Sequence, residues 1–260
     1  MDKEYIKRLA EDPTFIPGIY NYCDRWCEHC QFTSRCMNFA LSEEQFDDPQ
    51  AHDIKNEAFW QELQEVFQVT LEMLKETAKE QGIDLDCLDL HAKVEENKKL
   101  DDIAQNHGCA HSAKAYAEMV KNWFDSSKDL FEEKADDLSL KARLELPNSD
   151  TVKEAAGLKD TVDIIRWYQH FIYVKLLRAV RGSMEKSSLS LDEFPKDSVG
   201  SAKVALIAMD RSIAAWGQMS TYFPQCRDDI LDILVHLDRL RRKTEEIFPN
   251  ARAFIRPGFD

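Results

Sequence analysis

The chain has 260 residues, which suffice for one large domain or two small ones. It holds only eight glycines and eight prolines, and this low content of turn residues favours long helices over a β architecture. The net charge of −14 repels the phosphates of nucleic acids and the head groups of anionic lipids, so a nucleic acid or a membrane surface is not an expected partner.

Apolar residues recur at helical spacing along most of the chain, and no segment shows the alternation typical of a strand. A capping-box pattern also predicts a helix start at Ser42. Together these signals predict an all-α protein, a bundle of about six to eight helices with a loop-rich N-terminal segment. The predicted helices cover residues 3–10, 53–81, 94–106, 112–124, 128–146, 160–181, 201–219 and 227–248.

The expected domain organisation is an N-terminal cysteine-rich segment, residues 1–50, packed on a helical bundle of residues 51–260. The clearest internal linker is the polar stretch 146–150, which contains a proline. The last ten residues carry Phe254, Ile255 and Phe259, which would be costly to leave in water, so this tail is expected to dock on the bundle.

The location expected from the sequence is the cytoplasm. Residues 1–13 carry charges where a signal peptide needs an apolar core. The densest apolar run, residues 164–180, contains Arg166, Lys175 and Arg178 and is therefore not a transmembrane span. Thiols stay reduced in the cytosol, and seven cysteines cannot all pair within one chain.

Four of the seven cysteines fall within residues 23–36, at Cys23, Cys27, Cys30 and Cys36. Thiolates at such density in a reducing compartment are typical ligands of a soft metal or an iron–sulfur cluster. We expect these four residues to bind zinc, each at about 2.3 Å, with a 4Fe-4S cluster as the alternative. Two disulfides within the segment, with no metal, are the remaining possibility.

The spacing of the first three cysteines, C-x3-C-x2-C, resembles that of radical SAM enzymes. The resemblance covers eight residues, and the chain has no alternating strand–helix pattern from which a partial barrel could be built. The same spacing is similar to that of small metal-chelating CxxxCxxCC proteins, in which a cysteine stands where this chain has Gln31. Neither resemblance assigns the chain to a family.

The residues between and beside the cysteines suit a metal site. Four thiolates with a zinc ion or a four-iron cluster would carry a net charge near −2, which Arg25, His29 and Arg35 could offset. Trp26 and Phe32 could shield the site from water. The same residues could form a surface for a partner, which the sequence does not identify.

A second group of candidates lies on the most apolar predicted helices. Asp163, Arg166 and His170 fall within about 60° of one another on a helical wheel, and Asp210 interrupts the small-residue helix 201–219. These residues form either a structural ion-pair network, a solvent-facing strip or a polar pocket in which His170 acts as an acid–base group with Asp210 as its partner.

The sequence thus leaves two classes of function open. The leading interpretation is a metal-binding protein that acts as a binding or scaffold module for a protein or small-molecule partner. The alternative is an enzyme, either redox-active through an iron–sulfur cluster or acid–base through His170 and Asp210. A second metal candidate, the pair His107 and His111, has the spacing of helical ligands, but Gly108 and Ser112 favour a helix junction there.

Overall fold

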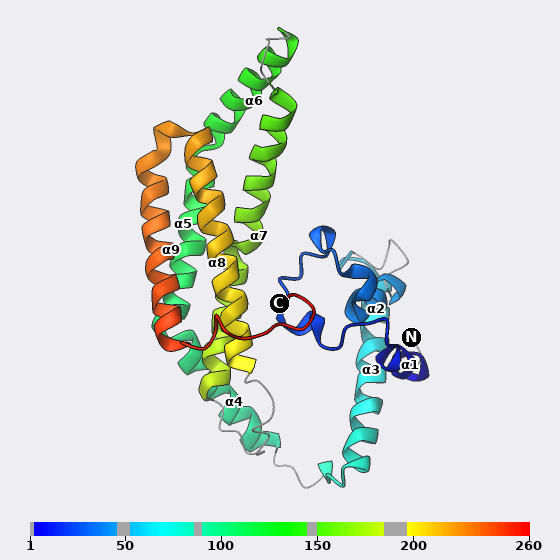
Figure 1. Ribbon diagram of the computed structural model, residues 1–260. Helices are drawn as coiled ribbons and strands as arrows, with labels where there is room; N and C mark the ends of the chain where they lie inside the picture. The colour runs from blue at the N-terminus through cyan, green and yellow to red at the C-terminus, as the bar shows by residue number, and fades with distance from the viewer. Residues whose placement is uncertain (1–2, 46–52, 86–89, 145–149, 185–196) are drawn as a thin grey trace. The chain divides into compact units, whose positions relative to one another are not determined.

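The computed structural model describes residues 3–45, 53–85, 90–144, 150–184 and 197–260 (Figure 1). Within these ranges there are nine α-helices, several 3-10 turns and no strand, which confirms the all-α prediction with slightly more helices than expected. No helix among the described residues is both long and apolar enough to cross a membrane. The chain separates into two compact units: a cysteine unit, Met1–Glu96 with Ile255–Asp260, and a bundle unit, Asn97–Phe254.

The bundle unit is built around four long helices that pack against one another. Figure 1 shows that successive neighbours run in opposite directions, as in an up-and-down bundle. A further helix, α6 (Lys128–Arg143), packs on α7. The four helices are α5 (Gly108–Ser126), α7 (Thr151–Met184), α8 (Asp197–Tyr222) and α9 (Arg227–Ile247).

Helix α8 lies against both α7 and α9, and its small residues explain why. Ala202, Ala205 and Ala208 are fully buried, and side chains of this size let the backbone of a neighbouring helix approach closely. Helix α7, which contains the densest apolar run of the sequence, is the longest of the described helices and contributes Ile165, Ile172 and other buried residues to the same core.

Aromatic side chains fill one end of the bundle. Trp216 of α8 has no exposed surface, and its ring meets that of Trp123 edge-on at 5.0 Å between centroids. The indole Nε1 of Trp216 donates a hydrogen bond of 3.3 Å to the hydroxyl of Tyr116. Burial raises the pKa of that hydroxyl to about 12, so Tyr116 stays neutral and can keep this contact. Phe131 and Phe223 extend the cluster.

In the described part of the cysteine unit, three complete α-helices accompany the 3-10 turns of the cysteine segment. Lys3 and Lys7 of α1 both pair with Glu76 of α3, so these contacts join the first and third helices. Its helices are α1 (Lys3–Glu11), α2 (Met37–Gln45) and α3 (Glu57–Glu80), and the first part of α4 (Leu90–Gln105) also belongs to it.

The helix start expected at Ser42 is wrong, because Ser42 lies inside α2. Its hydroxyl donates a hydrogen bond of 2.8 Å to the carbonyl of Phe39 within the same helix. A serine side chain can either cap the start of a helix or, as here, donate a hydrogen bond to a carbonyl in the preceding turn. The sequence pattern does not distinguish these two roles.

The unit boundaries place α3 with the cysteines, whereas the sequence suggested a division at residue 50. The linker expected at 146–150 lies, except for its last residue, outside the described residues. The C-terminal tail is shared between the units. Phe254 is buried in the bundle unit, where Lys203 donates a hydrogen bond of 2.5 Å to its carbonyl, and the residues after it belong to the cysteine unit.

Candidate metal-binding segment

The backbone of the cysteine segment folds back on itself through three short 3-10 turns: η1 (Ile19–Tyr22), η2 (Cys27–His29) and η3 (Thr33–Arg35). Gly18 precedes the first turn with a left-handed φ of 72°, and Arg25 lies between the first two turns with a φ of 59°. A left-handed backbone is costly for arginine, so the reversal at Arg25 depends on the surrounding structure.

These turns bring the four predicted ligands around one small cavity. Cys23, Cys27, Cys30 and Cys36 all line it, and its volume is about 20 Å³. That is little more than one water molecule needs. Apolar side chains make up most of the remaining wall; they include Ile19, Trp26, Phe32, Phe39 and Phe259.

The thiols are close enough to influence one another. Burial raises the pKa of the Cys27 thiol, and negative charge on Cys23, Cys36 and Cys30 raises it further, while Arg25 lowers it. A cation inside the cavity would reverse this balance, because it would favour the thiolate forms. The backbone N–H of Phe32 lies 3.4 Å from the sulfur of Cys30 and donates to it, which also stabilises a thiolate.

The side chains do not form a complete coordination sphere. Among the residues that the structure describes, no three His, Cys, Asp or Glu side chains are grouped closely enough to hold a metal ion. The structure therefore gathers the four cysteines around one space, and the expected metal stays a prediction.

The C-terminal tail supplies part of the cavity wall through Phe259, a role that its sequence does not indicate. The rings of Phe259 and Phe32 meet edge-on at 5.1 Å, and Arg256 is tied to Asp260 by hydrogen bonds of 2.9 and 3.1 Å. The apolar residues of the tail signalled that it would be buried. They did not indicate that Phe259 would lie beside the four cysteines, which are more than 220 positions earlier in the sequence.

Gly258 allows the tail to reach this position, and Gly258→Ala is expected to destabilise the cysteine unit. Its φ is 77°, and a Cβ atom there would lie 3.0 Å from side-chain carbons of Ile16 and Ile19. Strain and crowding together predict a loss of about 1–3 kcal/mol, measurable as faster amide hydrogen exchange in residues 15–36.

Gly217→Ala is the matched control for this change. Gly217 lies within α8, and a Cβ atom there would meet nothing within 4 Å. Because alanine is the better helix former by about 0.5–1 kcal/mol, this variant is expected to stabilise the bundle. Equal exchange rates in residues 15–36 for Gly258→Ala and wild type would show that the tail does not support the cysteine segment.

The second group of candidates does not form a pocket around His170. The imidazole of His170 lies on the exposed face of α7. Asp163 pairs with Lys159 one turn earlier, at 2.5 Å. The guanidinium of Arg166 stacks 3.8 Å above the ring of Phe124. These residues share a helix face, as the wheel predicts, but Asp163 and Arg166 each have a separate local contact and His170 is exposed.

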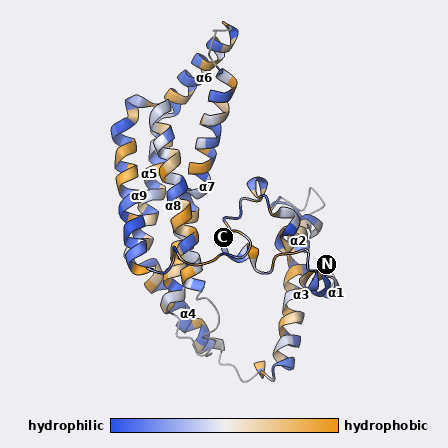
Figure 2. Ribbon diagram, viewed as in Figure 1, coloured by the Kyte–Doolittle hydropathy of each residue, from blue (hydrophilic) through white to orange (hydrophobic). Residues whose placement is uncertain are grey.

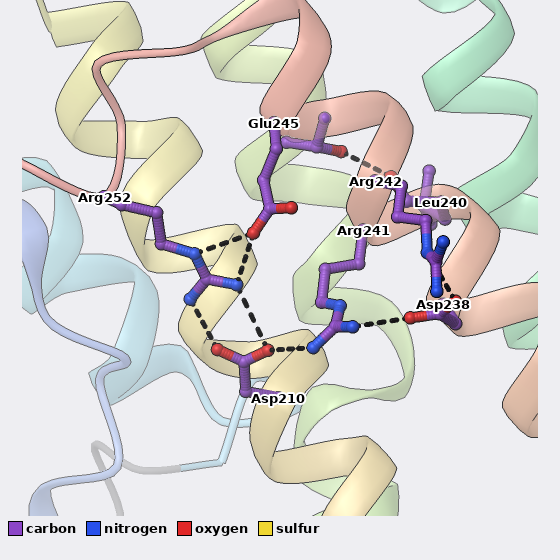
Figure 3. A network of polar contacts seen from close by, with 8 residues as sticks. Asp210, Asp238, Leu240, Arg241, Arg242, Glu245 and Arg252 are labelled. Carbon is purple, nitrogen blue, oxygen red and sulfur yellow. Dashed lines mark hydrogen bonds and ion pairs between the residues drawn. The ribbon is translucent and has the colours of Figure 1, made fainter.

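Asp210, the expected partner of His170, belongs to a different network (Figure 3). Arg252 donates to both carboxylate oxygens of Asp210, at 2.5 and 3.2 Å, and also to Glu245 at 2.9 Å. Arg241 donates to Asp210 at 3.4 Å and to Asp238 at 2.5 Å. This network joins the tail to α8 and α9. Its members are partly exposed, so each pair contributes little alone.

The histidine pair at residues 107 and 111 is explained by a helix start. The Nδ1 atom of His107 accepts a hydrogen bond of 3.2 Å from the backbone N–H of Cys109, which makes His107 the N-cap of α5. His111 lies within that helix. The junction expected from Gly108 is therefore confirmed, and the imidazole of His107 has a structural role.

The chain was compared with known proteins in three ways. No protein-family model, no curated protein and no solved structure matches it. Its function is therefore inferred from the chemistry of its own residues.

Proposed function

We propose that this protein is a zinc-binding module in which Cys23, Cys27, Cys30 and Cys36 hold one zinc ion and thereby stabilise the cysteine unit. The observation that carries the proposal is that all four cysteines line one small, mainly apolar cavity. Four thiolates are the ligand set of closed structural zinc sites. The mutual effect of the four thiols on the pKa of Cys27 is what a bound cation would relieve.

We prefer a single zinc ion to a cluster because four thiolates with no other ligand are a typical set of closed structural zinc sites. The cluster is the alternative occupant, because it uses the same four thiolates. It would make the protein a redox protein and not a binding module.

A site closed by four protein ligands leaves no open position on zinc for a substrate, so the role of the ion is structural. The function then lies in the surface that the ion holds in place. Arg25 and Arg35 are exposed beside the half-buried rings of Trp26 and Phe32. We assign the binding of a partner protein to this cationic and aromatic surface. An acid–base activity lacks comparable support, because arginines engage the Asp210 carboxylate.

Elemental analysis and a visible spectrum of protein purified anaerobically without added metal test this proposal. The expected result is one zinc per chain and no visible absorption. Four irons per chain, with absorption that bleaches on reduction, would replace zinc by the cluster. Protein that contains neither metal, and that takes up neither zinc nor iron when supplied, overturns the proposal in both forms.

A further inference from the structure

Helix α3 carries a row of exposed apolar side chains that its own unit leaves uncovered. Trp60, Phe67, Leu71 and Leu74 expose 53, 65, 50 and 57% of their surface. With Gln64, these residues follow one another at intervals of four, three, four and three, the 3.5-residue repeat of a coiled-coil seam. Figure 2 shows apolar residues along much of the length of α3. We call these five residues the α3 seam.

The α3 seam faces away from the contacts that hold α3 in its unit. At 100° per residue its five members lie within roughly 80° of one another, and Glu76 lies about 160° from Trp60. Glu76 is the residue that pairs with Lys3 and Lys7 of α1. The side of α3 opposite the seam therefore contacts α1, and the seam itself is exposed.

We propose that the α3 seam is the interface at which two copies of this chain associate. The positions that flank the seam would face each other across such a dimer, and in this chain they carry no carboxylate although the net charge is −14. Two acidic proteins can thus approach here without direct repulsion. The flanking residues are Gln61, Leu63, Gln68, Thr70, Lys75 and Thr77.

The acidic residues of α3 support the same choice of partner. Around the helix axis, the acidic residues within and after the seam lie roughly 120–200° from Trp60. They would therefore stay outside the interface between two copies. A cationic partner would gain nothing from this arrangement, whereas a second copy needs it. The residues are Glu62, Glu65, Glu72, Glu76 and Glu80.

Gln64 also favours a second copy. It occupies a core position of the seam, where a polar side chain must be satisfied by its partner. A side-chain amide both donates and accepts hydrogen bonds, so Gln64 and its counterpart in a parallel, in-register pair can satisfy each other. A single polar core residue of this kind fixes register at a cost in affinity.

The exposed area is sufficient for a reversible dimer. Four large side chains exposed by half or more amount to on the order of 400 Å² per helix, at the size where apolar patches on soluble proteins are often functional. Two copies would bury about 800 Å² through these residues alone and more with the flanking residues, which places the interface near the lower limit of stable complexes.

Sedimentation velocity of the full chain over a concentration series tests this proposal. The wild-type chain is expected to dimerise with a dissociation constant on the order of micromolar. The double variant Phe67→Glu/Leu74→Glu is expected to weaken the dimer at least about 100-fold, because two buried charges per chain would face each other. Gln64→Leu is expected to tighten it about tenfold, a gain that misfolding cannot imitate.

The control is Val174→Glu/Leu231→Glu, which places the same charges on equally exposed apolar positions of α7 and α9. It should leave the dimer unchanged. A wild-type chain that stays monomeric at about 100 µM overturns the proposal, and hydrogen exchange of α3 would then show whether its own bundle covers the seam. A dimer that survives Phe67→Glu/Leu74→Glu overturns it as well. Neither result depends on the metal.

Discussion

If the proposed zinc ion is bound, replacing Cys30 by alanine is expected to remove it and to unfold the cysteine segment while the bundle stays intact. Cys30 lies between the other ligands in sequence, and its sulfur accepts the N–H of Phe32. Three remaining thiolates bind zinc far more weakly than four, and structural zinc supplies folding energy in small units. We expect amide exchange in residues 19–36 to accelerate at least about 100-fold, which corresponds to a loss of about 3 kcal/mol.

Hydrogen exchange read by mass spectrometry is the suitable measurement, because it separates the two units. Cys226→Ala is the matched control, since Cys226 is the N-cap residue of α9 in the bundle unit and is not among the four cysteines of the cavity. It should leave both metal content and exchange in residues 19–36 unchanged. If Cys30→Ala retains a full equivalent of metal, or exchanges like wild type, the four cysteines are not the ligands.

Trp216→Ala is expected to have the largest effect on the bundle, a loss of about 3–5 kcal/mol in the free energy of unfolding. The side chain is fully buried, packs edge-on against Trp123 and donates a hydrogen bond to Tyr116. Its removal leaves a large cavity and takes a hydrogen-bond donor away from the buried Tyr116 hydroxyl. Urea unfolding followed by circular dichroism at a helical wavelength measures this loss.

Trp167→Ala is the matched control, because Trp167 of α7 is 37% exposed. The same chemical change should there cost about 1 kcal/mol or less, since far less apolar surface is lost from the core. Equal losses for the two variants would mean that the aromatic end of the bundle is not the packed core that Trp216 indicates.

Helical periodicity explains why so much of the bundle could be predicted from the sequence. In α9, the buried residues Ile230, Ile233, Leu237 and Leu240 follow intervals of three and four, and the predicted and observed ends differ by one residue. The helix α7 was predicted from residue 160 but begins at Thr151. Its first turns carry a buried Leu158 among charged and small residues, so the apolar signal there is weak.

The segment of the cysteine unit that carries the four cysteines was harder to predict, because its short 3-10 turns leave no periodic pattern. Its turns depend on single residues with special backbone angles, such as Gly18 and Arg25. Dense cysteines predicted that the side chains would gather, and the common cavity agrees with that. The participation of Phe259 could not be predicted, because a contact between distant segments leaves no local pattern.

The polar candidates show the same limit. A helical wheel placed Asp163, Arg166 and His170 on one face, but a wheel does not determine what lies opposite that face. Arg166 lies over an aromatic ring and Asp163 contacts a lysine of its own helix. Asp210 contacts Arg252, a residue 42 positions away on the tail, which no spacing rule indicates.

The tail that ends beside the cysteines has a consequence for biosynthesis. The cysteine unit combines the first 96 residues with residues 255–260, so the ribosome makes its last part only after the whole bundle. The ring of Phe259, which lines the cavity of the four cysteines, is then missing throughout elongation. The zinc ion that we propose would therefore find its complete site only after the bundle has been made.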